Sequence, residues 1–514
     1  MEPEIQLLAA GRFREAALAA SAGNLDDPDR RTIYGLALGG CGDFAGSFAQ
    51  LQRVAEIRPT EPHPCLDLLP ILRDCGREDQ IEPWLLAVLR ARPASPLVAL
   101  ELARHYRAEG CMARARELAR HALALTPRSA EAHRLMAWIL ADLGDLAASA
   151  EHSGQAVALD PGDAAAWSNL GVALTDLGRH QEGEHAHKQA LALAPGSPRI
   201  RVNRAVNLLA QGRMEEAWED YEWRLRLPGH TGLPPGQLLP ALAPGGRLDG
   251  RTILLTHEDG FGDTLQFARF APLLAQLGAT VLAHAPPPLE RLLGSLGHGI
   301  TILPSSAKLP AFDYHCPYTS LPRAFGVGLG TIPAAPYLFA DPALAAHWRA
   351  LLPAADRKIG LVWAGQARPW LEGYGPLDGR RSMRLNDFAP LGAITGITWI
   401  SLQKSSAGGE LDRPPAGIEL HDAMPQVHDF ADTAAIIAAL DAVISVDTSV
   451  AHLAGAMGKP VLLLDRFDTC WRWLRLRRDN PWYPSLTIFR QNRIGDWRAP
   501  VDQIADYLCT TEAF

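Results

Sequence analysis

The chain has 514 residues, of which 47% are hydrophobic and 21% charged, a balance typical of a soluble globular protein of roughly three domains. Its 49 lysines and arginines against 57 aspartates and glutamates give a net charge of −8, which argues against a protein that coats nucleic acid or anionic membranes. No apolar run approaches the ~20 residues needed for a membrane span, and the seven cysteines are too widely spaced for a zinc cluster or a disulfide framework. We therefore expect a cytoplasmic protein without a membrane span and without nucleic acid as a partner.

The first part of the chain repeats every 34 residues. Glycine recurs at this interval, at Gly42, Gly76, Gly110, Gly144, Gly178 and Gly212. Proline recurs at the same interval, at Pro59, Pro93, Pro127, Pro161 and Pro195. Glycine suits the left-handed turn after a first helix, and proline ends a second one. An earlier pair, Gly11 and Pro28, is out of phase by three residues. The period predicts about six stacked helix pairs over residues 1–228.

Small residues at matching positions would let the two helices of each pair approach closely. With the unit that reads Trp167-x-x-Leu170-Gly171, they make this region resemble the tetratricopeptide repeat (TPR) family. The resemblance implies a superhelix whose concave groove holds a peptide or protein segment. A dimerisation or scaffolding role is the alternative.

Beyond the repeats, a glycine- and proline-rich stretch over 229–250 predicts a linker or an irregular strap. Short apolar runs then alternate with helical segments. Strands are predicted over 252–255 and 280–284 and near 300 and 312, with helices over 264–277 and 288–296. The pattern restarts with strands over 359–363, 399–402, 442–446 and 461–464 and a helix over about 450–457. Two βαβ-containing halves, 251–345 and 346–514, are expected to bind ligands outside the carboxyl ends of their strands.

One strand-to-helix junction carries the residue types that bind phosphate. Asp447, Thr448 and Ser449 precede the predicted helix, and His452 falls in its first turn. Free backbone N–H groups and the helix dipole favour an anion there, and the two hydroxyls add donors. A nucleotide mono- or diphosphate would fit. A simple helix N-cap is the alternative.

Two motifs carry a family resemblance. The run from Val446 to Gly455, followed by Gly458-Lys459-Pro460, resembles the nucleotide-sugar-binding motif of the heptosyltransferase-like glycosyltransferases of family 9. Gly262-Asp263-Thr264-Leu265 resembles their N-terminal turn. The whole chain is similar to bacterial TPR glycosyltransferases, some of which glycosylate flagellin. The resemblance implies an α + α/β fold, an N-terminal TPR α-solenoid followed by a GT-B glycosyltransferase of two Rossmann-like domains, with the acceptor side at 251–345 and the nucleotide-sugar side at 346–514.

By this resemblance, Asp263 is the candidate general base that takes the proton of the acceptor hydroxyl. Glu258 and Asp259 are alternative carboxylates for this role. The substrate-binding candidates are Gly262, Thr264, Gly365, Arg381, Lys404, Asp447, Thr448, Ser449 and His452. No metal and no cofactor other than the nucleotide-sugar co-substrate is expected.

The leading hypothesis is a metal-independent glycosyltransferase (EC 2.4-type) with a protein acceptor held by the repeats. Flagellin modified with a nonulosonic acid from a CMP donor, a sialyl-type transfer, is one version. A lipopolysaccharide or other glycan acceptor, and a non-catalytic TPR scaffold with a degenerate GT-B domain, remain alternatives. Further along, a solvated helix face or a cleft lining is predicted for the four arginines Arg472, Arg475, Arg477 and Arg478. Core packing, or a platform for the donor, is predicted for Trp482 and Tyr483.

Overall fold

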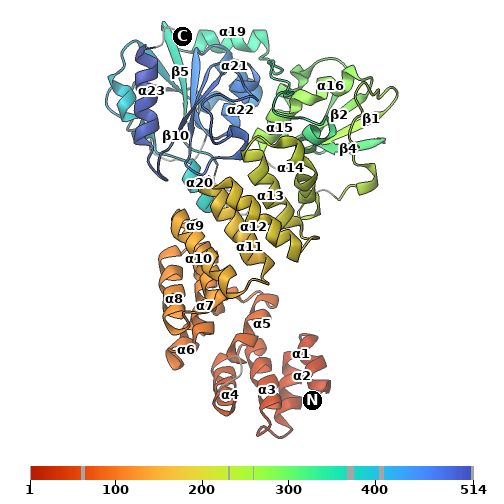
Figure 1. The fold of residues 1–514 in the computed structure, drawn as a ribbon, viewed down its shortest axis with the longest axis vertical. Helices are drawn as coiled ribbons and strands as arrows, with labels where there is room; N and C mark the ends of the chain where they lie inside the picture. The colour runs from red at the N-terminus through yellow and green to blue at the C-terminus, as the bar shows by residue number, and fades with distance from the viewer. Residues whose placement is uncertain are drawn as a thin grey trace. The chain divides into compact units, whose positions relative to one another are not determined.

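The computed structural model describes residues 2–58, 64–229, 232–258, 260–366, 375–404 and 410–510. The chain divides into two compact units, Met1–Asn169 and Leu170–Phe514 (Figure 1). The first unit is helical. The second holds the remaining helix pairs and two β-sheets. Nowhere in the described ranges does a helix have the length and apolarity to cross a membrane.

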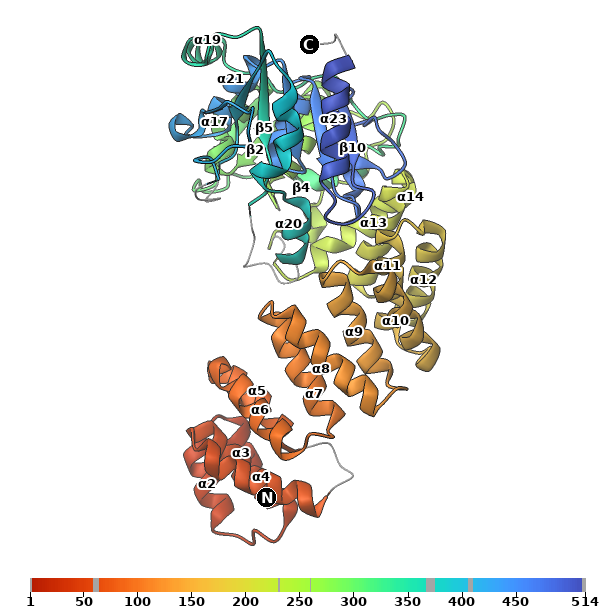
Figure 2. The ribbon, with the colours of Figure 1, turned by 90° about the vertical axis from the view of Figure 1, so that its left-hand side faces the viewer.

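Helix pairs build the N-terminal region. In chain order they are α1 (Glu2–Ala9) with α2 (Phe13–Ser21), α3 (Pro28–Cys41) with α4 (Phe44–Ile57), α5 (Leu68–Asp74) with α6 (Ile81–Ala91), α7 (Pro96–Ala108) with α8 (Met112–Leu125), α9 (Ala130–Asp142) with α10 (Leu146–Leu159), α11 (Ala164–Asp176) with α12 (His180–Leu193), and α13 (Pro198–Ala210) with α14 (Met214–Tyr221). Within the first unit, α7, α8 and α9 lie side by side (Figure 2). The described residues thus hold seven pairs instead of about six, since α1 and α2 form a pair around the out-of-phase Gly11.

The glycine and proline positions take the conformations that the period predicts. All six periodic glycines have positive φ, from 64° at Gly76 to 91° at Gly42, the left-handed region that side chains disfavour. Four periodic prolines stand two residues after the ends of α6, α8, α10 and α12. Pro59 lies outside the described residues. The repeat is therefore set by local backbone chemistry at each turn.

Gly171 lets α11 and α12 approach closely enough to bury a histidine. A Cβ atom at Gly171 would lie 2.5 Å from Cε1 of His187, whose ring is fully buried. Neither ring nitrogen of His187 has a hydrogen-bond partner among the described residues. Burial, and then the charge of Arg204, lower the pKa of His187 to about 4.

We expect acidification to destabilise the protein through this histidine. The folded-state pKa lies below the unfolded value of 6.5, so between about pH 6.5 and about pH 4 the unfolded chain binds more protons than the folded chain. The free energy of unfolding therefore decreases as the pH is lowered through this range. The expected loss between about pH 7 and about pH 5.5 is about 1 kcal/mol for this residue. Urea unfolding at both pH values measures it, and His187→Gln should flatten the dependence by that share. An equal pH dependence in wild type and variant would contradict the assignment.

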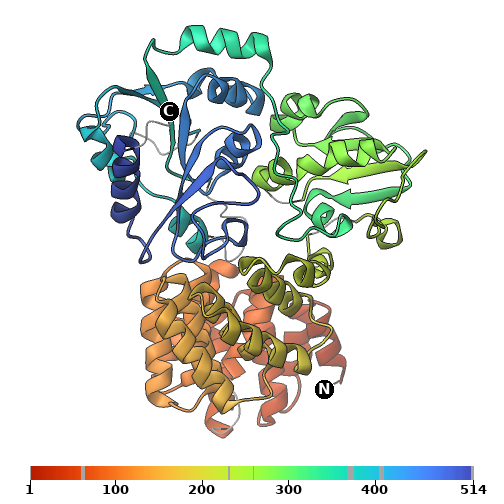
Figure 3. The same cartoon turned by 45° about the horizontal axis from the view of Figure 1, so that its top comes forward.

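The second unit contains two parallel sheets (Figure 3). The first has the order β3-β2-β1-β4, with β1 at Thr252–Thr256, β2 at Thr280–Ala285, β3 at Ile300–Pro304 and β4 at Tyr314–Pro317. The second has the order β10-β9-β8-β5-β6-β7, with β5 at Arg357–Val362, β6 at Ile397–Ser401, β7 at Leu420–Asp422, β8 at Ala442–Val446, β9 at Val461–Asp465 and β10 at Leu486–Arg490. β8 and β9 are buried along their whole length because helices cover both faces of the sheet. This is the predicted α/β architecture, and it follows the helical solenoid in the sequence.

The helices of the second unit differ in detail from the prediction. The helix expected over 264–277 is split into α15 (Phe261–Phe267), a 3₁₀ turn (Ala268–Phe270) and α16 (Ala271–Gln276). Pro272 has no N–H to continue the hydrogen-bond ladder of α15. The helix expected over 288–296 is reduced to α17 (Glu290–Leu293) between two 3₁₀ turns. Helices α18 (Leu321–Ala324), α19 (Pro342–Leu351), α20 (Gly375–Arg381), α21 (Phe430–Ala438) and α23 (Arg498–Thr510) complete the unit with α22 (Ser449–Ala456).

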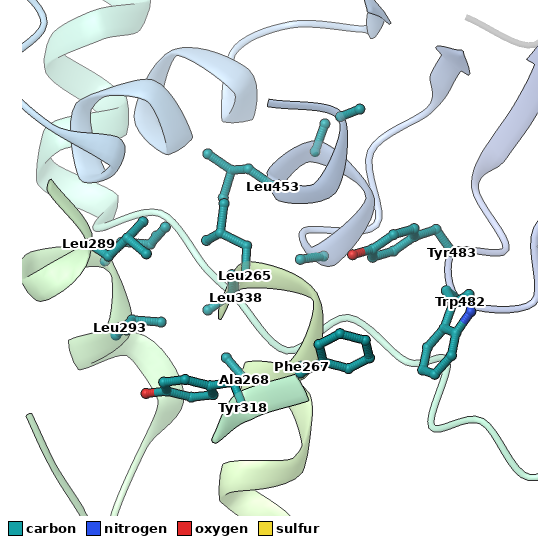
Figure 4. Close-up of a cluster of buried hydrophobic side chains, with 14 of the residues drawn as sticks. Leu265, Phe267, Ala268, Leu289, Leu293, Tyr318, Leu338, Leu453, Trp482 and Tyr483 are labelled. Carbon is teal, nitrogen blue, oxygen red and sulfur yellow. The ribbon is translucent and has the colours of Figure 1, made fainter. Parts of the chain in front are cut away.

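The two sheet-containing halves share one hydrophobic core. Leu265 and Phe267 of α15 face Leu453 of α22 and Trp482, and all of these side chains are buried (Figure 4). The ring of Phe267 meets that of Trp482 edge-on at 5.6 Å. Trp482 and Tyr483 are therefore core residues. Packing of α15 against α22 brings the beginnings of both helices into one region.

The last repeat pair joins the same core. Trp218 of α14 donates its indole N–H to the Val327 carbonyl (2.7 Å) and packs edge-on against Trp471, at 6.0 Å between ring centroids. The stretch predicted as a linker or strap runs along the first sheet, where the Leu239 N–H donates to the His315 carbonyl (2.8 Å). Helices α13 and α14 are thus continuous with the α/β region in one compact unit.

A second contact joins the turn between α11 and α12 to the segment after β9. Arg475 donates to the backbone carbonyls of Asp176 (2.9 Å) and Phe467 (3.0 Å). A Cβ atom at Gly178 would lie 2.4 Å from Nε of Arg475. Burial, and then the charge of Asp468, raise the pKa of Asp176.

Gly178→Ala should therefore destabilise the protein more than Gly212→Ala. Both glycines have φ near +78° (79° and 77°), so both variants suffer the left-handed strain of about 1–2 kcal/mol. Only at Gly178 does the new methyl group displace a hydrogen-bonded arginine, because the nearest atom at Gly212 is 3.4 Å away. We expect a further loss of about 1.5–3 kcal/mol, measured by urea unfolding. Equal losses would show that the Arg475 contact does not contribute.

Candidate active site

The candidate site lies at the carboxyl edge of the second sheet. Strands β5, β6, β8 and β9 are parallel neighbours, so the segments that follow them emerge at the same edge. These segments carry Gly365, Lys404, Asp447 and Arg466 respectively. An edge of this kind is where open parallel sheets bind ligands.

Helix α22 begins at this edge with an open N-terminus. Thr448 is its N-cap residue, in extended conformation with φ −140° and ψ 167°, and its side chain makes no capping hydrogen bond. The Thr448 hydroxyl instead pairs with the Ser445 hydroxyl at 3.0 Å. The first N–H groups of the helix, at Ser449 and Val450, have no partner within the helix itself. These donors and the helix dipole are available to an anion.

Arg381 lies beside this N-terminus. It approaches the Asp447 carbonyl (3.5 Å) and forms an ion pair with Asp378 (2.9 Å). A Cβ atom at Gly365 would lie 2.7 Å from Cζ of Arg381, so only glycine leaves room for the guanidinium group. The structure thus brings Gly365, Arg381 and Asp447 together, although Arg381 is 66 residues from Asp447 in the sequence.

Two further arginines, Arg466 (buried) and Arg380 (half-buried), were not predicted as site residues from the sequence. Arg380 (2.9 Å) and Arg466 (3.2 Å) both form ion pairs with the buried Asp468. Arg466 is 7% exposed, and its Nε has no hydrogen-bond partner among the described residues. Burial alone would lower the pKa of Arg466, but Asp468 and Asp447 raise it overall. Its position directly after β9 was the available sequence clue.

Asp263 lies in the first turn of α15. One carboxylate oxygen accepts from the Gly260 N–H (3.3 Å), and the other forms an ion pair with Arg472. The Asp263 side chain is 19% exposed. Gly262 next to it packs on His452, since a Cβ atom there would lie 2.8 Å from Cδ2 of that ring. The candidate base therefore meets the first turn of α22 across the two halves.

The prediction of a solvated arginine helix over 472–478 was wrong for Arg472 and Arg475. The segment contains only a 3₁₀ turn, Trp471–Trp473, because both tryptophans are buried and hold it against the core. Arg472 is thereby drawn inward, its guanidinium group 4.4 Å from the Trp471 ring centroid. Only further along does the chain return to the surface, where Arg477 pairs with Asp479.

The alternative carboxylates stand apart from this arrangement. Glu258 is buried and bound by Arg224 (2.8 Å) and Thr319, so its charge is already matched within the protein. Asp259 lies outside the described residues. Thr264 is buried, and its hydroxyl is hydrogen-bonded to His257 (2.7 Å).

His452 is buried between the two halves instead of lining the open edge. Its Nδ1 is hydrogen-bonded to the Tyr483 hydroxyl (3.0 Å), and its ring stacks on Trp473 at 4.8 Å. Burial, then the charge of Arg472, lower the pKa of His452 to about 3, so the ring is neutral. Lys404, after β6 at the same edge, is exposed and donates to the Val427 carbonyl (2.9 Å).

Comparison with known proteins identifies the domain around this edge. Residues 426–493, which contain α21, β8, α22, β9 and β10, match glycosyltransferase family 9 (heptosyltransferase). In this segment the chain is therefore similar to a family 9 glycosyltransferase, and the segment follows the region of 34-residue helix pairs in the sequence. The candidate phosphate-binding helix of this glycosyltransferase domain lies inside the matched segment, and Asp263 lies outside it.

Relatives extend the likeness over more of the chain. Protein FlbA of Caulobacter vibrioides is 27% identical over 322 residues, covering 57% of this chain and 52% of FlbA. The chain thus spans about half the length of the curated relative that it matches. MamA of Desulfovibrio magneticus RS-1 is 18% identical (32% of this chain, 92% of MamA, TM-score 0.29). YrrB, a TPR protein with an unusual peptide-binding site, is 15% identical (34% of this chain, 91% of YrrB, TM-score 0.28).

Proposed function

We propose that the protein transfers a sugar from a nucleotide-sugar donor to a protein acceptor recruited by its repeats, without a metal ion. The observation that carries the proposal is the uncapped N-terminus of α22, with Arg381 beside it, inside the family 9 segment. Backbone N–H groups and guanidinium groups are the donors that bind a phosphate without a metal.

In the proposed reaction the leaving phosphate sits at Thr448 and Ser449. Its developing negative charge is stabilised by the helix N-terminus and by Arg381, with Lys404 as a further cation at the same edge. Asp263 accepts the proton of the attacking hydroxyl, because a neutral hydroxyl is a poor nucleophile. Gly262 and Thr264 position the turn that presents Asp263, and the His452 ring packs against this turn at Gly262.

We further propose a cytoplasmic protein acceptor, with flagellin and a nonulosonic acid from a CMP donor as one specific case. The arginine-rich edge supports an anionic donor, since Arg380, Arg381 and Arg466 gather there. The 34-residue helix pairs support a peptide acceptor, because stacked pairs of this kind present a concave binding surface.

A nucleotide-binding panel on the full chain tests the proposal. CMP, ADP, UDP and GDP are titrated separately, with magnesium and with EDTA, and followed by calorimetry and thermal unfolding. At 100 times its Kd, the cognate nucleotide should stabilise the protein by about 2.7 kcal/mol, equally in EDTA. Arg381→Gln should weaken that binding, whereas the surface variant Arg477→Gln should not. Stabilisation by CMP supports the nonulosonic acid version, and ADP, UDP or GDP instead indicates a heptose or hexose donor. Absence of binding by all four would favour a non-catalytic scaffold.

A further inference from the structure

Arg472 connects the candidate base to the candidate phosphate site. It belongs to the segment after β9, in the second half, whereas its ion-pair partner Asp263 belongs to the first half. Both lie at the first turn of α22. Gly262 packs on the His452 ring, and Trp473, next to Arg472, stacks on the same ring. The ion pair of Arg472 with Asp263 therefore joins the two halves beside the His452 ring, in the first turn of α22.

The guanidinium group also has donors to spare. Within the part of the chain that the structure describes, its Nη1 donates to the Cys470 sulfur (3.3 Å), a weak acceptor, and its Nε is buried without a hydrogen-bond partner. Arg472 belongs to the same segment after β9 as Arg466 and Asp468, which form an ion pair at the sheet edge. A half-buried guanidinium group with unused N–H groups is suited to bind the oxygens of a doubly charged phosphate group.

We infer that Arg472 exchanges partners during the reaction: it holds Asp263 when the donor site is empty and moves to the donor phosphate when the site is filled. This inference rests on the proposed function. A phosphate group offers more charge and more acceptor oxygens than one carboxylate, so it competes for the same guanidinium group. Asp263 then becomes free to accept a proton only after the donor has bound.

The exchange gives the reaction an order. The acceptor hydroxyl oxygen forms a bond to the anomeric carbon as the bond from that carbon to the phosphate oxygen breaks. The hydroxyl proton passes to Asp263, and the electron pair of the broken bond leaves with the nucleotide, whose charge Arg472 then neutralises. Without donor, the paired carboxylate does not act as a base.

Nucleotide affinity of single and double variants of the full chain tests the exchange. The probes are CMP, ADP, UDP and GDP, with whichever binds the wild type carried forward. Asp263→Asn removes the competing charge and should bind the nucleotide about 3- to 10-fold more tightly. Arg472→Gln removes a charged phosphate ligand and should bind it about 10- to 100-fold more weakly. In the double variant, Asp263→Asn should change the affinity less than about twofold, because no arginine remains to be released.

Further variants separate this role from a structural one. Arg472→Lys keeps the charge and should restore part of the affinity, while Arg477→Gln, whose ion pair with Asp479 lies at the surface, should leave it unchanged. A purely structural ion pair predicts instead that Asp263→Asn weakens binding or leaves it unaltered. That result, with nucleotide binding to the wild type intact, would overturn the exchange and leave the proposed function standing. Failure of all four nucleotides to bind the wild type would instead remove the proposed function.

Discussion

Asp263→Asn should lower the rate of sugar transfer by about 10²- to 10⁴-fold, the usual contribution of a general base. The amide has nearly the shape of the carboxylate and still accepts from the Gly260 N–H, so the turn that begins α15 should persist. The loss should therefore fall on kcat, and nucleotide binding should not be weakened. Incorporation of sugar into the acceptor, measured at saturating donor once the nucleotide panel has identified it, provides the rate.

Two further substitutions make this experiment decisive. Asp249→Asn replaces an exposed carboxylate that pairs with Arg247, and should leave the rate unchanged. Glu258→Gln tests the alternative base. Because Glu258 is bound by Arg224, we expect this variant to lose stability while its remaining folded fraction keeps its rate. Full activity of Asp263→Asn together with an inactive but folded Glu258→Gln would move the base assignment to Glu258.

The largest effect on stability is expected for Arg224→Ala. Arg224 follows the last repeat helix, is 3% exposed, and donates to Glu258 (2.8 Å), Thr319 (2.7 Å) and Ser320 (2.6 Å) of the first α/β half. Burial alone would lower the pKa of this guanidinium group, but Glu222 and Glu258 raise it overall. Its removal leaves the Glu258 carboxylate buried without a cation, at a cost of about 3–5 kcal/mol.

Urea unfolding followed by tryptophan fluorescence measures this loss. Arg226→Ala is the matched control, since that arginine is exposed and stacks on Trp223, with 3.8 Å from Cζ to the ring centroid. We expect about 0.5–1 kcal/mol there. Adding Glu258→Gln to Arg224→Ala should recover part of the loss, because the unpaired charge is removed. Equal losses in the two arginine variants would show that the buried ion pair does not tie the repeats to the α/β region.

These two predictions concern opposite ends of the same turn. Glu258 lies in the segment after β1, and Asp263 stands in the first turn of α15 five residues later. Arg224 from the repeats holds one carboxylate and Arg472 from the second half holds the other. The turn that presents the candidate base is therefore fixed by parts of the chain on both sides of it, which supports an active site whose geometry depends on the last repeat pair.

Much of the fold could be predicted from the sequence because it is local. A glycine with positive φ and a proline behind each second helix specify the repeat within one helix pair, so the 34-residue interval sufficed. The prediction was likewise correct almost to the residue for the strand over 442–446 and the helix that follows it in the sequence. Here an apolar run, a polar turn and a helix of small residues follow each other directly. The split of the helix at Pro272 was missed although its cause is also local.

The sequence by itself therefore determined the helix pairs, the α/β region and the strand-to-helix turn at Asp447–Ser449. Only the tertiary structure decided which charges meet. Asp263 and Arg472 are 209 residues apart, and no pattern along the chain distinguishes a buried arginine at 472 from an exposed one at 477. His452 appeared in a binding motif, yet its ring is enclosed by Trp473, Tyr483 and Gly262. Burial and ion pairing depend on packing between distant segments, which local spacing does not encode.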